Sequence, residues 1–151
     1  MNIFLRIVIC VAIVAIQSSW MAADRGTAEE AVAMVHKVIA SMKKIGKEKT
    51  LDDINKGKYI DRDLYISVTD GAGKSVANSV NPRIVGKNVS DLRDADGKFF
   101  VREGSEIVKA KGKGWIDFKW PDPVSKKIEA KSTYLEQYED LVVGCGIYKT
   151  K

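Results

Sequence analysis

The first stretch suited to binding a small molecule is Trp-Ile-Asp-Phe-Lys-Trp at 115–120. In an extended strand the side chains alternate, so Phe118 and Trp120 would share one face while Trp115 and Asp117 share the other. The two tryptophans supply a large apolar surface with polar N–H groups, and the acid could meet a cation or a hydroxyl. A core strand with one solvent-exposed edge explains the same pattern. At least one tryptophan is therefore expected to be structural.

A second stretch, Lys-Ser-Thr-Tyr at 131–134, offers complementary chemistry. Alternation pairs Lys131 with Thr133 and Ser132 with Tyr134. A lysine on an inner face of a sheet would give a carboxylate both a charge and a hydrogen-bond donor, and a tyrosine would add a hydroxyl. The alternative is a surface lysine and a core tyrosine.

Other chemistries lack the residues that they need. His36 is the only histidine, so a histidine-based triad or metal site has no material. The Asp-Ala-Asp-Gly run at 94–97 lacks the ligand spacing of a calcium loop and predicts a turn. Gly-Lys-Asn at 86–88 lacks the flanking residues of a phosphate-binding loop. The lysines at 109–113 stand among acids, which favours a solvated face over a nucleic-acid site. We therefore expect no metal, no cofactor and no nucleic-acid partner.

These residues must be positioned by one long helix and a sheet. The apolar spacing predicts a helix over 24–46, begun by a capping box of Thr27 and Glu30 and ended at Gly46. β-forming residues and turn signals predict strands over 64–69, 75–78, 115–120, 130–137 and 140–148, a short capped turn over 50–55 and a helix over 99–111. Short turns between sequential strands favour an antiparallel arrangement. The prediction is an α+β fold with a long N-terminal helix packed on a five-stranded antiparallel sheet. The middle segment would cover the other face and leave a pocket.

The first 23 residues have the three-part layout of a secretory signal peptide. A short basic start precedes ten unbroken apolar residues at 7–16 and a small polar region that ends at Ala23. The run is shorter than the roughly 20 apolar residues of a membrane span, although an uncleaved anchor remains the alternative. Cleavage would leave 24–151 as a single domain with Cys145 as its sole cysteine, no internal disulfide and no membrane span. Of 151 residues, 45% are hydrophobic, which excludes a disordered chain.

The stretch from Asp63 to Lys149 resembles single Cache domains, the PAS-like extracellular sensor modules of bacterial chemoreceptors and histidine kinases. Nine pieces match in order and spacing over about two-thirds of the mature chain, and the long N-terminal helix agrees. They are 63–66, Asn81-Pro82, 85–88, 94–98, 100–103, 114–121, Lys126, 131–134 and 144–148.

The resemblance implies a small-molecule pocket between a PAS-like sheet and its long covering loop. Such domains typically bind organic acids, amino acids or similar metabolites. Relatives often carry a histidine where Asn78 stands and a tyrosine where Phe118 stands, so the ligand can differ from theirs. Most relatives continue into a membrane helix and a signalling domain, whereas this chain ends at Lys151 and resembles a free-standing secreted form.

We therefore expect a periplasmic or secreted, non-catalytic sensor domain for a small metabolite, such as a carboxylate, in signal transduction or chemotaxis. Its expected ligand-binding residues are Asn78, Trp115, Asp117, Phe118, Trp120, Lys131 and Tyr134. A membrane receptor or kinase would read the bound state, and the sequence identifies none. The alternatives are a secreted protein-interaction module that has kept this fold without a working pocket, and an enzyme. The first lacks a ligand, and the second would need two close carboxylates of perturbed pKa.

Overall fold

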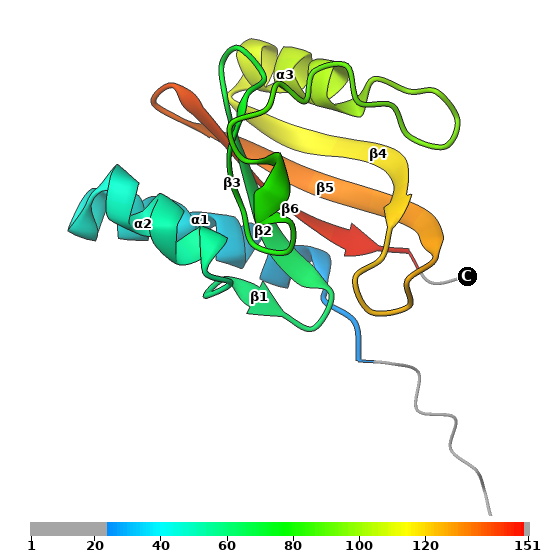
Figure 1. Cartoon of the computed structure of the whole chain (residues 1–151), viewed down its shortest axis with the longest axis horizontal. Coiled ribbons are helices and arrows are strands. Elements are labelled where there is room, and N and C mark those ends of the chain that lie inside the picture. The colour runs from blue at the N-terminus through cyan, green and yellow to red at the C-terminus, as the bar shows by residue number, and fades with distance from the viewer. Residues whose placement is uncertain (1–23, 150–151) are drawn as a thin grey trace, which may run out of the picture.

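The computed structural model describes residues 24–149, so the expected signal peptide lies outside the described residues. One helix-rich N-terminal segment is followed by a sheet with a helix inserted between its third and fourth strands (Figure 1). The elements are α1 (Ala28–Ile45), α2 (Lys47–Asn55), β1 (Ile60–Asp61), β2 (Leu64–Asp70), β3 (Ser75–Asn78), η1 (Pro82–Ile84), α3 (Phe100–Lys111), β4 (Lys113–Pro121), β5 (Ile128–Tyr138) and β6 (Leu141–Tyr148).

The sheet is antiparallel and runs β1-β2-β6-β5-β4, with β3 pairing with β2. Its five long strands are the five that the sequence predicts. The sixth, β1, is a two-residue strand that pairs with the start of β2 and was not expected. Strand β6 therefore lies at the centre between β2 and β5, and the β4–β5–β6 segment forms a continuous meander.

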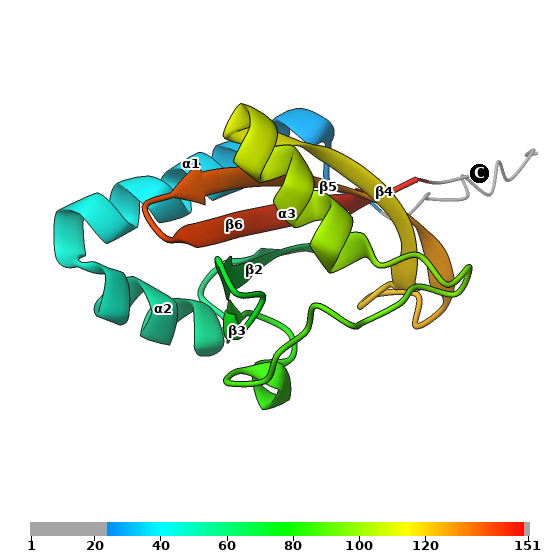
Figure 2. The same ribbon diagram turned by 90° about the horizontal axis from the view of Figure 1, so that it is seen from above.

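Helix α1 covers one face of the sheet, and α3 covers the other (Figure 2). The expected capping box begins α1: the Thr27 side chain accepts from the Glu30 N–H at 3.2 Å, and the Glu30 carboxylate accepts from the Thr27 N–H at 2.8 Å. The apolar stripe of α1 is buried against Ile66, Val143 and neighbouring side chains of the sheet. Burial of this stripe provides the main hydrophobic core.

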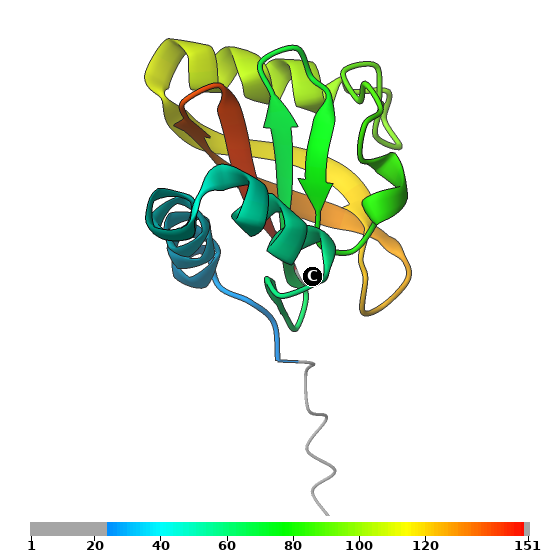
Figure 3. The ribbon, with the colours of Figure 1, turned by 60° about the vertical axis from the view of Figure 1, so that its left-hand side comes forward.

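The chain turns sharply after α1 and continues as a second helix. Gly46 has φ +94°, a left-handed conformation that interrupts α1 after Ile45. A nine-residue helix, α2, follows at once, where the sequence predicts only a short turn at 50–55. Figure 3 shows α1 nearly end-on, with α2 beside β3 and the loop of residues 79–99 on the far side of β3. No helix within 24–149 combines the length and the hydropathy that a membrane crossing needs.

Candidate functional site

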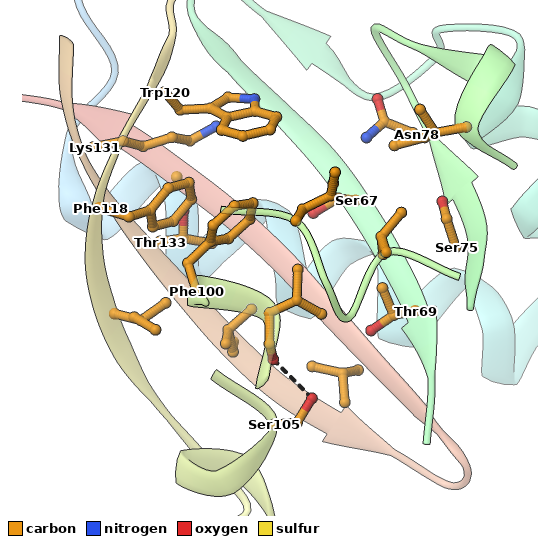
Figure 4. A pocket seen from close by; sticks show the side chains of 18 of the residues that line it. Ser67, Thr69, Ser75, Asn78, Phe100, Ser105, Phe118, Trp120, Lys131 and Thr133 are labelled. Carbon is orange, nitrogen blue, oxygen red and sulfur yellow. Dashed lines mark hydrogen bonds between the residues drawn. The ribbon is translucent and has the colours of Figure 1, made fainter. Parts of the chain in front are cut away.

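A cavity of about 110 Å³ lies on the face of the sheet opposite α1. All five long strands contribute to its floor, α3 forms one wall, and the loop of 79–99 contributes Ile84, Val89 and Leu92 (Figure 4). The space accommodates several water molecules or a ligand of a few heavy atoms. The pocket thus lies where the sequence predicts it, between the sheet and the middle segment.

Lys131 supplies the only charge in the lining of this pocket. The residue is 4% exposed, and its Nζ lies 3.8 Å from the centre of the Tyr65 ring and 4.8 Å from that of the Tyr148 ring. No carboxylate of residues 24–149 lies within 4.0 Å of this Nζ. Aromatic faces attract a cation, but they offset only part of the cost of burying one. The ammonium is therefore poised to accept an anionic partner.

The absence of a side chain at Gly146 allows Lys131 to lie flat on the sheet. A Cβ added there would stand 2.3 Å from Lys131 Cε and 2.4 Å from Thr133 Oγ1. Gly146 belongs to β6 and is paired with Thr133 of β5. The glycine thus leaves the space that both polar groups occupy.

Two neutral polar side chains of the pocket lining, Thr133 and Asn78, retain hydrogen-bonding capacity. The Thr133 hydroxyl is buried and has no partner among the described residues. The Asn78 Oδ1 accepts from the N–H groups of Val80 and Asn81 at 3.1 and 2.8 Å, which fixes the orientation of the amide. Its Nδ2 consequently faces the pocket as a donor (Figure 4). Buried polar groups in native proteins usually have partners, so the unpaired hydroxyl favours a polar ligand.

The remaining wall is aromatic. Phe100 of α3 stacks on Phe118 of β4 with ring centroids 4.3 Å apart and planes 8° apart. Trp120 packs against both rings at 4.9 and 6.1 Å. These contacts hold α3 on the sheet and give the pocket a rigid apolar side.

The structure brings four of the seven predicted site residues together in this pocket: Asn78, Phe118, Trp120 and Lys131. The other three, Trp115, Asp117 and Tyr134, lie on the opposite face of the sheet and do not line this pocket. Alternation along β4 and β5 requires this separation once Phe118 and Lys131 face the pocket.

Each of these three residues has a structural environment of its own. Tyr134 is buried in the core with α1, and its hydroxyl donates to Glu136 at 2.5 Å. Burial and, to a lesser extent, that carboxylate raise the pKa of Tyr134 to about 12. Trp115 packs beside Tyr134 at 5.4 Å and is 38% exposed. Asp117 pairs with Lys149 at 2.9 Å on the surface, and hydrogen bonds from Ser132 and Lys149 lower its pKa.

Sequence reasoning missed Tyr65, Ser67 and Phe100, which also line the pocket. Alternation along the predicted strand of 64–69 places Tyr65 and Ser67 on one face, and this signal could have found them. Phe100 lies in the predicted helix over 99–111, where side chains do not alternate between two faces, so this signal does not apply to it.

No group of three or more His, Cys, Asp and Glu side chains within 24–149 is placed to hold a metal ion. Cys145 lies under α1, where burial raises the pKa of its thiol to about 12. A thiol in that state is a poor nucleophile. The pocket itself presents one ammonium, neutral polar groups and aromatic rings.

Comparison with known proteins agrees with this architecture. Residues 6–150 match the family model "Single Cache domain 2". The methyl-accepting chemotaxis protein McpP of Pseudomonas putida KT2440 is 26% identical over 90 residues, which are 58% of this chain and 16% of that protein. The chain thus matches only a small part of that relative's length.

Two solved structures share the fold. A methyl-accepting chemotaxis protein from Vibrio parahaemolyticus superposes with a TM-score of 0.70 at 25% identity, over 80% of this chain and 86% of that one. A structure described as showing carboxylic acid recognition by a Cache chemosensory domain gives 0.69 at 20% identity, over 81% and 92% of the two chains. Single Cache domains are extracellular or periplasmic sensor domains of chemoreceptors. The protein belongs to the single Cache domain 2 family.

Proposed function

We propose that this protein is a non-catalytic periplasmic sensor domain that captures a small monocarboxylate in the pocket around Lys131. The observation that carries the proposal is a buried ammonium that faces a cavity and, among residues 24–149, has aromatic rings but no carboxylate as partners. A carboxylate would supply the missing counter-charge and accept hydrogen bonds from Lys131 and Thr133. A membrane receptor or kinase would then read the occupied state.

The charge of the pocket favours one class of acid over others. A single cation matches a single carboxylate, whereas a dicarboxylate would bury a second, uncompensated negative charge. The lining holds no acidic residue that could pair with the ammonium of an amino acid. The small cavity and the ring cluster of Phe100, Phe118 and Trp120 favour a short apolar chain. A monocarboxylate of a few carbons meets all three conditions.

Titration calorimetry with acetate, propionate, butyrate and pyruvate tests the proposal, with propionamide as the neutral control. We expect at least one acid to bind and the amide not to bind. Lys131→Met keeps the length of the side chain and removes the charge. Because a hydrogen bond to a charged group contributes about 1.5–3 kcal/mol, the affinity should fall roughly 10- to 100-fold. Lys127→Met, on the exposed β4–β5 loop, is the matched control and should bind normally.

Thermal unfolding supplies a second readout, since a ligand that binds only the native state raises the melting temperature. Equal binding by wild type and Lys131→Met would refute the role of the ammonium. Binding of none of the four acids would favour an interaction module without a working pocket.

The proposed location follows from the N-terminal pattern of residues 1–23. Export with cleavage after Ala23 would give a mature protein that begins at Asp24. Intact mass measurement on the periplasmic fraction tests this, and retention of the apolar run would indicate an anchor instead.

A further inference from the structure

A partly buried cluster of charged side chains anchors the segment that enters α1. The guanidinium of Arg25, two residues before the cap of α1, forms ion pairs with Asp122 and, at 3.3 Å, with Asp63. Glu129 lies 3.5 Å from the same guanidinium. The side chains of both aspartates are fully buried. We refer to Arg25, Asp63, Asp122 and Glu129 as the Arg25 cluster.

The cluster connects three segments that are distant in sequence. Asp63, in the β1–β2 turn, also accepts a hydrogen bond from the Gly26 N–H at 2.7 Å. Asp122, in the β4–β5 loop, also accepts from the Val124 N–H at 2.7 Å. Figure 1 shows the segment that enters α1 running close to both of these connections. The position of this segment therefore depends on the β1–β2 turn and on the β4–β5 loop.

Both rings that hold Lys131 are attached to this cluster. Tyr65, near the start of β2, lies two residues after Asp63 of the β1–β2 turn. Tyr148 donates its hydroxyl proton to the carbonyl of Pro121 at 2.7 Å, and Pro121 directly precedes Asp122. Burial and the neighbouring Tyr65 raise the pKa of Tyr148, so this hydroxyl stays protonated and remains a donor. The pocket ammonium is thus connected to each buried aspartate through one tyrosine and one or two residues of backbone.

The charges are also complementary. Two buried carboxylates against one guanidinium leave a surplus negative charge. The ammonium of Lys131 carries the opposite charge and contacts the rings of Tyr65 and Tyr148. A ligand carboxylate would pair with that ammonium and cancel its positive charge. The two aspartates would then depend more strongly on the positive charge of Arg25.

We propose that the Arg25 cluster couples occupancy of the Lys131 pocket to the segment that enters α1, so that ligand binding tightens the hold of Asp63 and Asp122 on Arg25. This inference rests on the proposed function, namely that an anion binds at Lys131. Coupling between two sites is reciprocal. The factor by which bound ligand strengthens the ion pairs of the Arg25 cluster is therefore the factor by which loss of the Arg25 charge lowers the affinity for the ligand.

Hydrogen exchange and calorimetry on the full chain test the coupling, with the tightest-binding acid of the four-acid panel as the probe. We expect the acid to slow exchange of the amides at 26–31 in the wild type. Arg25→Met should lower the affinity for the acid at least five-fold and abolish its effect on those amides. Arg25→Lys, which keeps the charge, should restore much of the affinity and serves if Arg25→Met does not fold.

Arg62→Met is the matched control. Arg62 also holds the start of α1, through Glu30 at 2.8 Å and the carbonyl of Arg25 at 3.1 Å, but it does not pair with Asp122. Its loss should leave the affinity within two-fold of the wild type. An equal loss of affinity in both variants would overturn the proposal, because it would indicate general loosening of α1.

A ligand-free measurement separates this inference from the proposed function. The NMR signal of the Lys131 side chain, assigned with Lys131→Met, should shift in Arg25→Met and not in Arg62→Met. If no acid of the panel binds the wild type, the proposed function fails, and the shift still decides whether the cluster and the pocket are coupled. An unchanged Lys131 signal refutes the coupling.

Discussion

Gly146 determines how closely the Lys131 side chain approaches the sheet. A substitution at Gly146 should therefore affect both ligand affinity and the free energy of unfolding. Gly146→Ala would place a methyl group within 2.4 Å of the Lys131 and Thr133 side chains. Overpacking of this kind typically costs about 1–3 kcal/mol. We expect lower stability in urea unfolding and weaker binding of the monocarboxylate, since Lys131 must move. Gly71→Ala, whose Cβ would meet only a backbone oxygen at 3.9 Å, is the control and should change neither. Unaltered binding by Gly146→Ala would mean that the observed position of Lys131 is not needed.

The sequence was sufficient to nominate Lys131, Phe118 and Trp120 but not to separate them from Tyr134. The two-residue alternation along a strand shows which side chains share a face. It does not show which face of the sheet carries a pocket. Lys131 and Tyr134 are three residues apart and so cannot face the same side of one strand. The assignment needed α1 and α3 in place on their respective faces, which is information from tertiary packing.

At the level of elements, Gly104 is the position at which α3 packs directly against a side chain of the sheet. A Cβ at this position would stand 2.6 Å from Leu135 Cδ1. In an open helix Gly→Ala stabilises by about 0.5–1 kcal/mol, but here the methyl group would push α3 away from β5. We expect Gly104→Ala to lower the free energy of unfolding by about 1 kcal/mol, measured in urea. Lys109→Ala, an exposed change on the same helix, should stay within about 0.5 kcal/mol. A gain in stability from Gly104→Ala would show that the contact with Leu135 adjusts freely.

Long elements with strong patterns were predictable, and short ones were not. The helix of 24–46 and the longer strands are recognisable because their periodicity extends over six residues or more. Strand β3 has four residues and follows instead from the turn signal at 70–73. Strand β1 has two residues, both exposed, so no alternation could reveal it. Helix α2 was underestimated because Lys47, Glu48 and Lys49 carry no apolar signal, while Gly46 suggested only an end. Packing of Ile54 into the core, together with contact between α2 and β3, stabilises this helix.

At the scale of the whole molecule, the accessibility of Cys145 shows whether α1 is packed on the sheet. It lies at the centre of the sheet on β6, 1% exposed, with its sulfur 3.8 Å from that of Met34 on α1. Burial raises the pKa of its thiol to about 12, so the reactive thiolate is scarce at pH 8. Alkylation of the native protein should therefore require that α1 separate from the sheet.

The resulting prediction concerns the rate at which iodoacetamide modifies Cys145 at pH 8, followed by peptide mass spectrometry. The rate should be very low in buffer and should rise steeply across the urea unfolding transition, where the thiol regains a pKa near 8.5. If the reactive opening is global, a ligand that binds only the folded protein slows modification by the factor 1 + [L]/Kd, so a hundred-fold excess over Kd gives about a hundred-fold protection. Protection in the wild type but not in Lys131→Met would show that the ligand binds at Lys131. It would also show that binding on this face of the sheet stabilises the packing of α1 on the other face. Rapid labelling in buffer, or a rate indifferent to urea, would show instead that α1 opens locally without the rest of the fold.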